Sequence, residues 1–351
     1  MAKFNAWEYA DADHTAVSVV GGPTKNPKKM TGTRLGAICG LNKWKTPFQA
    51  WCEICRVAEE PFEDNKFTIA GKAIEPKLIA WCKTEISPYI YTPEQWFKTK
   101  NPGYDFFPEN DIFGGMWDAI VLDGPLGKGT PVALVEAKTS SRPQDWLDGV
   151  PDSYAIQGLS YIELFGVDTV FFPVALLDPD DYDDPSAFEC TDDNTILREL
   201  SVISPVAGKT IQEHMNYAED WWAVHVSGNQ SPAFNEKTDA VFLKIMRKSE
   251  VKSDDLEALA KEAAVLETKI EVIKSKGELA DLEKRLKGLK DQLKRGMIPL
   301  FSDNDETVSA YGWKVKRSVT EKLDNEAIKA DGLWETYATT EEMFRLSKES
   351  N

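Results

Sequence analysis

The amino-acid sequence predicts an α/β fold in which helices flank a short mixed β-sheet, followed by a helical hairpin near the C-terminus. Helical patterns precede a run of short β-like segments, a helix and a strand follow that run, and apolar residues then recur at helical spacing. We expect a core over residues 1–227, a linker over 228–252, an antiparallel helical hairpin over 253–296 and a C-terminal tail segment over 297–351.

The composition indicates an intracellular protein that does not cross a membrane. Charged residues make up 28% of the 351 residues, and no stretch approaches the roughly 18 consecutive apolar residues of a membrane span. The N-terminus has neither an apolar run nor a cleavage pattern, and the number of cysteines, five, is odd. We therefore expect reduced cysteines and a cytoplasmic location.

The net charge of −17 argues against nucleic acid as a partner, but the distribution of the charge weakens that argument. Residues 178–193 hold eight acids and no base, whereas residues 22–45 hold six bases and no acid. We expect a local positive surface at residues 22–45. The three histidines lie far apart in the sequence, so carboxylates and lysine are the better candidates for catalysis.

Two helices are expected before the strands. The Thr-Pro pair at 46–47 supplies a cap and then a proline at the first helical position, so one helix begins there. A second helix is expected over roughly 65–85. Pro76 lies inside it and clashes with the carbonyl four residues earlier, so a kink or a helix boundary is expected beside Glu75.

The segments 114–124 and 130–140 are expected to pair as a β-hairpin, because each is a short apolar run bordered by turn residues. Asp118 and Glu136 are equidistant from Gly127 in the intervening turn. A symmetric hairpin therefore places their Cβ atoms about 5 Å apart on neighbouring strands.

The second strand of this hairpin places an acid and a base on one face. Residues two apart in a strand share a face, so Glu136 and Lys138 project together with Val132 and Leu134. Two facing carboxylates beside a buried strand favour a cation between them, and oxygen ligands fit Mg²⁺ or Mn²⁺. A lysine there can hold an attacking water or stabilise charge on a phosphate. The arrangement is typical of metal-assisted phosphodiester hydrolysis, and an ordinary salt-bridged hairpin is the alternative.

Further helices and one strand are expected beyond the hairpin. They are a helix over 151–166, a strand over 167–177 and, after the acidic loop, a long helix that ends near residue 226. Over 253–295 the apolar phase slips at 275–277, which favours two helices joined there. That helical hairpin is either a self-packed strut or oligomer contact, or a site for a partner protein.

Several motifs occur in an order and spacing that resemble the YqaJ-type viral recombinase family. They are GKAIEP at 71–76, GMWDAIV at 115–121, VEAKTS at 135–140 and DW-x2-GVP-x2-Y-x2-Q at 145–157. These proteins are phage-lambda-type alkaline exonucleases of the PD-(D/E)xK nuclease superfamily. The resemblance spans about residues 30–177 and implies a restriction-endonuclease-like core.

The resemblance also implies roles for particular residues. Glu75 is the helical acid that borders the site, and Lys138 is the catalytic lysine. Asp118 and Glu136 bind the metal, with the Ala137 carbonyl as a further ligand. The implied remaining site residues are Gln157, which helps to order the lysine and the substrate, and Arg34, Thr31, Thr33, Lys43, Lys45 and Tyr161, which contact DNA or its 5′ phosphate.

Some of these residues also have a purely structural interpretation. Thr31 and Thr33 either share the phosphate contact or cap a helix. Trp44, between two lysines, either stacks on an unpaired base or is a partly buried anchor. Cys52 and Cys55 lie on one helix face, which favours core packing over the iron–sulfur cluster of some related nucleases.

The sequence therefore predicts a Mg²⁺-dependent exodeoxyribonuclease that acts on the ends of double-stranded DNA. The resemblance implies that it removes the 5′-ended strand, leaves 3′ single strands for phage-type recombination and works with a single-strand annealing protein, in the host cytoplasm if a phage encodes the chain. The sequence leaves the oligomeric state open between a monomer and a homo-oligomer. The alternatives are a structure- or sequence-specific endonuclease on the same scaffold and a catalytically inactive DNA-binding or assembly module.

Overall fold

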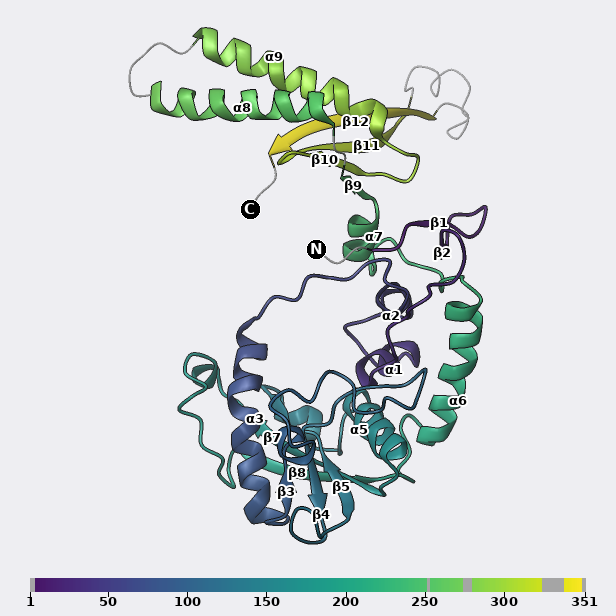
Figure 1. Ribbon diagram of the computed structural model, residues 1–351, viewed down its shortest axis with the longest axis vertical. Helices are drawn as coiled ribbons and strands as arrows, with labels where there is room; N and C mark the ends of the chain where they lie inside the picture. Colours follow the sequence, from purple (N-terminus) through teal and green to yellow (C-terminus); the bar gives the residue numbers. More distant parts are fainter. Residues whose placement is uncertain (1–3, 251–252, 274–279, 324–337, 349–351) are drawn as a thin grey trace. The chain divides into compact units, whose positions relative to one another are not determined.

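The computed structural model describes residues 4–250, 253–273, 280–323 and 338–348. The chain forms two compact units, Met1–Phe242 and Leu243–Asn351 (Figure 1). The domain boundaries predicted at residues 227, 252 and 296 remain predictions. No helix among the described residues is long and apolar enough to cross a membrane.

The first unit begins with a small antiparallel sheet and two short helices. Their bounds are β1 Trp7–Tyr9, β2 Val17–Val19, α1 Gly32–Ile38 and α2 Pro47–Ile54. Thr46 caps α2, because its side chain accepts a hydrogen bond from the backbone N–H of Gln49 at 3.1 Å. The predicted start of this helix is confirmed.

The next helix, α3 (Lys66–Glu85), is 20 residues long and has Asn65 as its cap. It continues through Pro76, so the boundary that we expected as one possibility beside Glu75 is absent. The proline removes one helical N–H, while Ile74 and Leu78 on either side of it are buried in the core. Packing of this apolar face outweighs the local cost of the proline.

A mixed six-stranded sheet forms the centre of the first unit (Figure 1). Its strands are β3 Ile90–Tyr91, β4 Ala119–Leu122, β5 Pro131–Val135, β6 Lys138–Ser140, β7 Thr169–Leu176 and β8 Thr195–Ser201. The antiparallel strands β4 and β5 form the predicted hairpin, in which Ala119 pairs with Val135 and Ile120 with Leu134. Strands β5 and β6 both run parallel to β7, and β8 pairs antiparallel to it. The predicted α/β core with a short mixed sheet is confirmed.

Helices cover both faces of β7. On one face Ala175 packs in a cluster with Ile74 and Leu78 of α3. On the other face Phe172 contacts α5 (Asp152–Phe165), where a Cβ added at Gly158 would lie 2.4 Å from the ring. The absence of a side chain at this glycine lets α5 approach the sheet closely.

The remaining elements of the first unit are short helices and one longer helix. They are α4 Pro93–Trp96, the 3₁₀ turns η1 Pro143–Trp146 and η2 Pro179–Tyr182, α6 Ile211–Trp221, and the π-helical η3 Trp222–Ser227. Helix α7 (Ala240–Met246) spans the boundary between the units.

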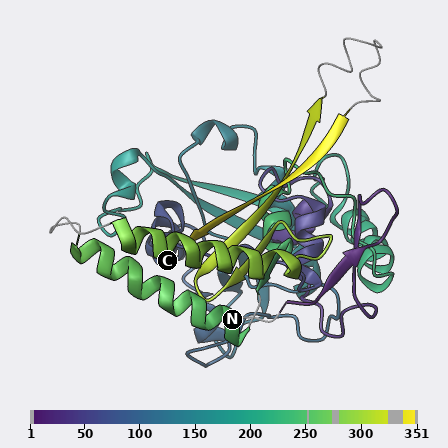
Figure 2. The same cartoon turned by 90° about the horizontal axis from the view of Figure 1, so that it is seen from above.

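The second unit packs two long helices on a four-stranded sheet. Its elements are β9 Lys248–Glu250, α8 Asp254–Ile273, α9 Ala280–Met297, the 3₁₀ turn η4 Ile298–Leu300, β10 Thr307–Ala310, β11 Trp313–Leu323 and β12 Ala338–Lys348. The strand order is β12-β11-β10-β9. Helices α8 and α9 lie side by side (Figures 1 and 2). The predicted helix junction at 275–277 lies outside the described residues.

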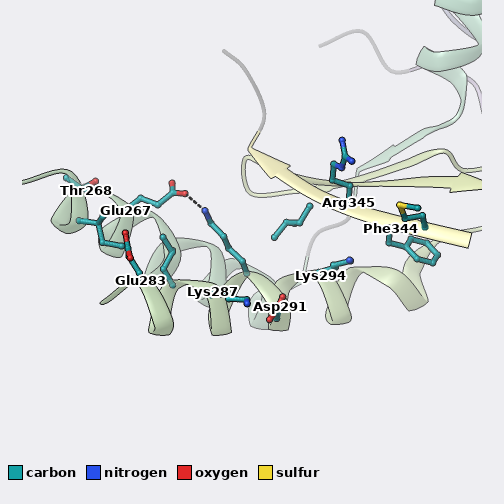
Figure 3. Close-up of a pocket in the computed structure, with 13 residues that line it drawn as sticks. Glu267, Thr268, Glu283, Lys287, Asp291, Lys294, Phe344 and Arg345 are labelled. Atoms are coloured by element: carbon teal, nitrogen blue, oxygen red, sulfur yellow. Dashed lines mark ion pairs between the residues drawn. The ribbon is translucent and has the colours of Figure 1, made fainter. Parts of the chain in front are cut away.

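A groove of about 810 Å³ lies in the second unit between these helices and β12 (Figure 3). Lys287 and Lys294 of α9 line it together with Phe344 of β12, and Lys290 forms an ion pair with Glu267 across it at 2.8 Å. The groove contains none of the predicted catalytic residues.

Candidate active site

Asp118 and Glu136 meet where β4 begins and β5 ends. The register of the hairpin continues through the hydrogen bond from the Asp118 N–H to the Val135 carbonyl, at 3.1 Å. The Asp118 carboxylate then accepts a hydrogen bond from the Ala137 N–H at 2.7 Å. Ala137 lies in the two-residue gap between β5 and β6, where its N–H is free to bond the Asp118 carboxylate. This hydrogen bond holds Asp118 beside the segment that contains Glu136.

Glu136 and Lys138 project from the same face, as predicted, and Gln157 of α5 joins them. One oxygen of Glu136, Oε1, accepts hydrogen bonds from Lys138 Nζ at 2.7 Å and from Gln157 Nε2 at 2.6 Å. Lys138 Nζ also lies 3.5 Å from Gln157 Oε1. The other oxygen of Glu136, Oε2, is buried and has no hydrogen-bond partner among the described residues.

Two glycines allow the elements around Gln157 and Tyr161 to approach. A Cβ at Gly32 of α1 would lie 2.5 Å from Gln157 Cγ. A Cβ at Gly115 would lie 2.4 Å from the Tyr161 ring, and Gly115 has φ +146°. Tyr161 is buried, and its hydroxyl lies 3.5 Å from Gln157 Nε2. The glycine of GMWDAIV is therefore required for both its backbone conformation and this close contact.

Glu75 lines a pocket beside Lys138. A pocket of about 290 Å³ joins one face of α3 to β6 and α5, and Glu75, Lys138 and Tyr154 are among its lining residues. The pocket also contains Phe67 and Thr139. Glu75 and Lys138, which are distant in the sequence, therefore line the same pocket.

The charges of the site oppose ionisation of its acids. Burial, together with the charge of Asp118, raises the pKa of Glu136 to about 8 and that of Glu75 to about 7. Glu75 is exposed over part of its surface, but the neighbouring protein displaces water from its carboxyl group. Burial also raises the pKa of Asp118, against the opposing effect of Lys138.

Lys138 remains a cation in these surroundings. Burial lowers its pKa, but the charges of Glu136 and Asp118 outweigh that effect and raise it above the usual range for lysine. A single lysine therefore faces several acids, and a further cation would relieve the repulsion among them.

The donor set fits a hard divalent cation. Two carboxylates and the Ala137 carbonyl are available, and the unpartnered Glu136 Oε2 is a buried oxygen that a cation would satisfy. Among the described residues, no group of three or more His, Cys, Asp or Glu side chains is arranged to hold a metal. A small number of protein ligands is characteristic of Mg²⁺, which keeps several waters.

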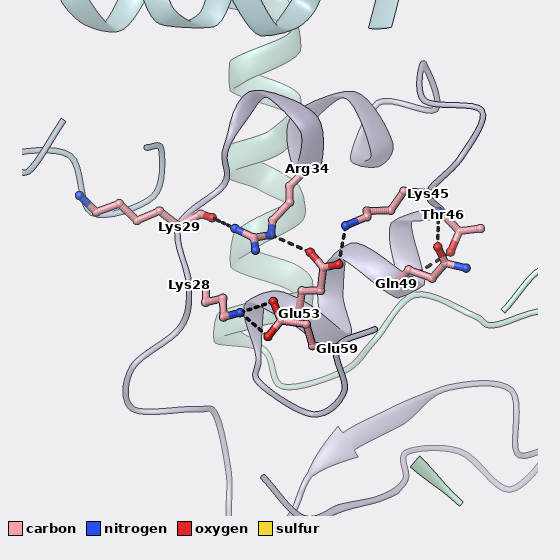
Figure 4. Close-up of polar contacts among 8 residues, drawn as sticks. All are labelled: Lys28, Lys29, Arg34, Lys45, Thr46, Gln49, Glu53 and Glu59. Atoms are coloured by element: carbon pink, nitrogen blue, oxygen red, sulfur yellow. Dashed lines mark hydrogen bonds and ion pairs between the residues drawn. The ribbon is translucent and has the colours of Figure 1, made fainter. Parts of the chain in front are cut away.

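The lysines and arginine predicted to bind phosphate are mostly paired with acids (Figure 4). Arg34 Nε donates to Glu53 at 3.0 Å, and Lys45 forms an ion pair with the same carboxylate. Two more ion pairs of 2.6 Å link Lys28 to Glu59 and Lys29 to Asp105. Three acids from outside residues 22–45 therefore pair with four of the six bases in that segment and lower the local charge, and the positive surface there remains a prediction.

Other predicted contacts are placed as follows. Thr31 is the N-cap residue of α1 but makes no capping hydrogen bond with its side chain, and Thr33 is exposed. Lys43 is exposed, and Trp44 is 83% exposed, which excludes its interpretation as a buried anchor. Their contacts with DNA remain predictions.

Cys52 and Cys55 are buried free thiols, which confirms that they pack in the core. Tyr154, for which no role was predicted, lines the pocket beside Lys138. The signal for this residue was its place in the DW-x2-GVP-x2-Y-x2-Q motif.

The motifs predicted an α/β core with two carboxylates and a lysine close together. Asp118, Glu136 and Lys138 lie at or beside the ends of β4, β5 and β6 in such a core. Residues 25–166 match the model of the YqaJ-like viral recombinase domain family. The family predicted from the motifs is confirmed. The match supports a nuclease of the YqaJ and alkaline exonuclease type.

The chain is also similar to uncharacterised bacterial proteins. Protein MG373 of Mycoplasma genitalium is 26% identical over 257 residues, which cover 62% of this chain and 87% of that protein. Protein YqaJ of Bacillus subtilis is 22% identical over 277 residues, which cover 77% of this chain and 75% of that protein.

Two solved structures share weaker similarity with the chain. The alkaline exonuclease LHK-Exo of Laribacter hongkongensis, in complex with dAMP, has 17% sequence identity and a TM-score of 0.39, covering 56% of this chain and 86% of that one. A phage-related exonuclease from Haemophilus somnus has 17% identity and a TM-score of 0.38, covering 57% and 96%.

Proposed function

We propose that the protein is a Mg²⁺-dependent exodeoxyribonuclease that acts on the ends of double-stranded DNA, removing the 5′-ended strand and leaving a 3′ single strand for recombination. The observation that carries this proposal is the buried Oε2 of Glu136, which has no hydrogen-bond partner among the described residues and belongs to the carboxylate whose other oxygen contacts Lys138. The family match over residues 25–166 supports the same chemistry.

Each residue of the site has a distinct task in this proposal. Asp118, Glu136 and the Ala137 carbonyl would hold Mg²⁺, or Mn²⁺ in its place. The metal, when bound, supplies charge neutralisation at the phosphate and activation of the attacking water. Lys138 holds that water or stabilises the charge that develops on the phosphate, and Gln157 orients Lys138 through their shared contact with Glu136.

The terminal phosphate of the DNA would compete with Glu53 for Arg34. Glu53 holds Arg34 Nε and Lys45 together, so an incoming phosphate that took over Arg34 would leave Lys45 to neutralise Glu53. A guanidinium group recognises a phosphate through two parallel hydrogen bonds. Thr31, Thr33, Lys43 and Tyr161 complete the proposed DNA contacts. A single-strand annealing protein and further copies of this chain are the proposed partners.

The proposal is tested with end-labelled linear duplex and covalently closed circular plasmid, each incubated with Mg²⁺. We expect progressive shortening of the linear duplex, faster from 5′-phosphate than from 5′-hydroxyl ends, and an intact circle. Cleavage of the circle at a rate similar to that of the linear duplex would instead indicate an endonuclease. Binding of the duplex without hydrolysis in Mg²⁺ or Mn²⁺ would indicate an inactive DNA-binding module.

A further inference from the structure

The aromatic residues of the DW-x2-GVP-x2-Y-x2-Q motif, Trp146 and Tyr154, have no role in the chemistry described so far. We infer that Tyr154 is a positioning residue whose ring face holds the ammonium group of Lys138 in the site. This inference rests on the proposed function, since it assigns a task to Tyr154 through the lysine of that site.

The geometry around Lys138 carries the inference. Lys138 Nζ lies 5.3 Å from the centroid of the Tyr154 ring, within the range of about 6 Å in which the ring face attracts a cation. The Lys138 side chain is only 14% exposed, so little water competes for the ammonium group. Its other neighbours are Glu136 Oε1 at 2.7 Å and Gln157 Oε1 at 3.5 Å. A carboxylate, an amide and a ring face therefore surround one ammonium group.

The ring is itself held by the motif's tryptophan. Trp146 stacks on Tyr154 with their centroids 5.5 Å apart and their planes 13° from parallel. Trp146 is 1% exposed, and its carbonyl accepts hydrogen bonds from Arg198 Nε at 3.2 Å and from Arg198 Nη2 at 2.9 Å. Arg198 of β8 thus holds the backbone of Trp146 in η1, and the Trp146 ring holds the Tyr154 ring. The Tyr154 ring in turn limits the positions that the Lys138 side chain can take.

The ring, and not the hydroxyl group, is the part of Tyr154 that acts. Among the described residues its hydroxyl has no hydrogen-bond partner, whereas its ring contacts both Trp146 and Lys138. A ring face attracts the ammonium group without a net charge of its own. A further carboxylate at this position would add to the repulsion among Glu75, Asp118 and Glu136.

The first test compares Tyr154→Phe with Tyr154→Leu in hydrolysis of linear duplex DNA with Mg²⁺. We expect Tyr154→Phe to keep the wild-type rate, because the ring remains. Tyr154→Leu should lower kcat by roughly 10-fold with little change in KM, because the lysine loses its position and the DNA contacts remain. Tyr104→Leu is the matched control, since Tyr104 is 87% exposed and lies outside the site. Equal losses for Phe and Leu, or no loss for Leu, would overturn the inference.

A second series keeps the shape of the ring. Phenylalanine at position 154 is replaced by mono-, di- and trifluorinated phenylalanine, which weaken the negative potential of the ring face while nearly conserving its volume. We expect kcat to fall stepwise with fluorination. A flat series would contradict a role for the ring face even if Tyr154→Leu failed to fold.

A third measurement needs no nuclease activity, and so separates this inference from the proposed function. In protein labelled with ¹³C-lysine, the ε-methylene resonance of Lys138, assigned by its absence in Lys138→Ala, should show an upfield ring-current shift. That shift should persist in Tyr154→Phe and disappear in Tyr154→Leu. If the shift is present in a protein that does not degrade DNA, the placement of Lys138 stands and the proposed function falls. A resonance at the free-lysine position in the wild type would contradict the placement itself.

Discussion

Replacing Gly158 by alanine has two opposing effects on stability, a gain in helix propensity and a steric clash with the sheet. The structure indicates that the clash is the larger of the two. Gly158 lies inside α5, where alanine is favoured over glycine by about 1 kcal/mol in a helix without other contacts. A Cβ at this position would lie 2.4 Å from Phe172 Cζ and 3.1 Å from Val170 Cγ2. Phe172 is fully buried, so it cannot move aside without disturbing the sheet.

Overpacking of this kind costs up to about 3 kcal/mol. We therefore expect Gly158→Ala to destabilise the first unit by about 2 kcal/mol, the overpacking less the gain in helix propensity. Because α5 also carries Gln157, which lies 2.6 Å from Glu136, its displacement should slow DNA hydrolysis by about 10-fold.

The matched control is Gly288→Ala in α9, where a Cβ would meet no atom within 4 Å. That substitution should stabilise the second unit by up to about 1 kcal/mol. Urea unfolding, followed for each unit by fluorescence of labels attached to that unit, measures both changes. A Gly158→Ala variant as stable as the wild type would contradict this prediction, because it would mean that α5 does not pack closely against β7.

The remaining predictions concern the metal, the pH and the DNA end. Without metal, the free energy of unfolding should fall as the pH rises from about 5 towards 8. The pKa of Glu136 is about 8 in the folded protein, whereas that of an unfolded glutamate is about 4.3. Glu136 therefore stays protonated in the folded protein at low pH, and the stability that this proton supplies is lost as the pH rises between these two values. Mg²⁺ should therefore raise the melting temperature more at pH 8 than at pH 5.5, and equal shifts at both values would contradict a metal on Glu136. Ca²⁺ should also stabilise the protein against heat yet support little cleavage, since its looser coordination positions the water poorly, and rapid Ca²⁺-driven hydrolysis would count against this site. Arg34→Ala should abolish the preference for 5′-phosphate over 5′-hydroxyl ends, and a retained preference would move that role to another residue.

Local features of the sequence predicted the centre of the fold correctly. The pairing of Ala119 with Val135 follows from symmetry about Gly127, because a hairpin closes on itself and its register depends on the turn. The start of α2 followed from the Thr-Pro pair at 46–47 for a similar reason, since a helix cap acts within one turn.

Features that depend on distant parts of the chain were missed. Counting charges over residues 22–45 could not reveal that Glu53 and Asp105 neutralise Arg34 and Lys29, because folding sets those distances. The sheet of the second unit was missed for a different reason, because the two-residue turn Tyr311–Gly312 that joins β10 to β11 is a local hairpin signal that was not used. Nor does any pattern of spacing place the Tyr154 ring beside Lys138, which requires α5 to pack against the sheet.

In the proposed function Lys138, beside Asp118 and Glu136, acts in the hydrolysis of DNA. The most direct measurement is the initial rate of shortening of a 5′-phosphorylated linear duplex in Mg²⁺ by the wild type, by Lys138→Ala and by Lys128→Ala. Lys128 is exposed in the turn of the same hairpin and serves as the matched control. We predict equal rates for the wild type and Lys128→Ala, and no measurable hydrolysis by Lys138→Ala in a protein that still unfolds cooperatively on heating. Hydrolysis by Lys138→Ala at the rate of the control would contradict this role for Lys138.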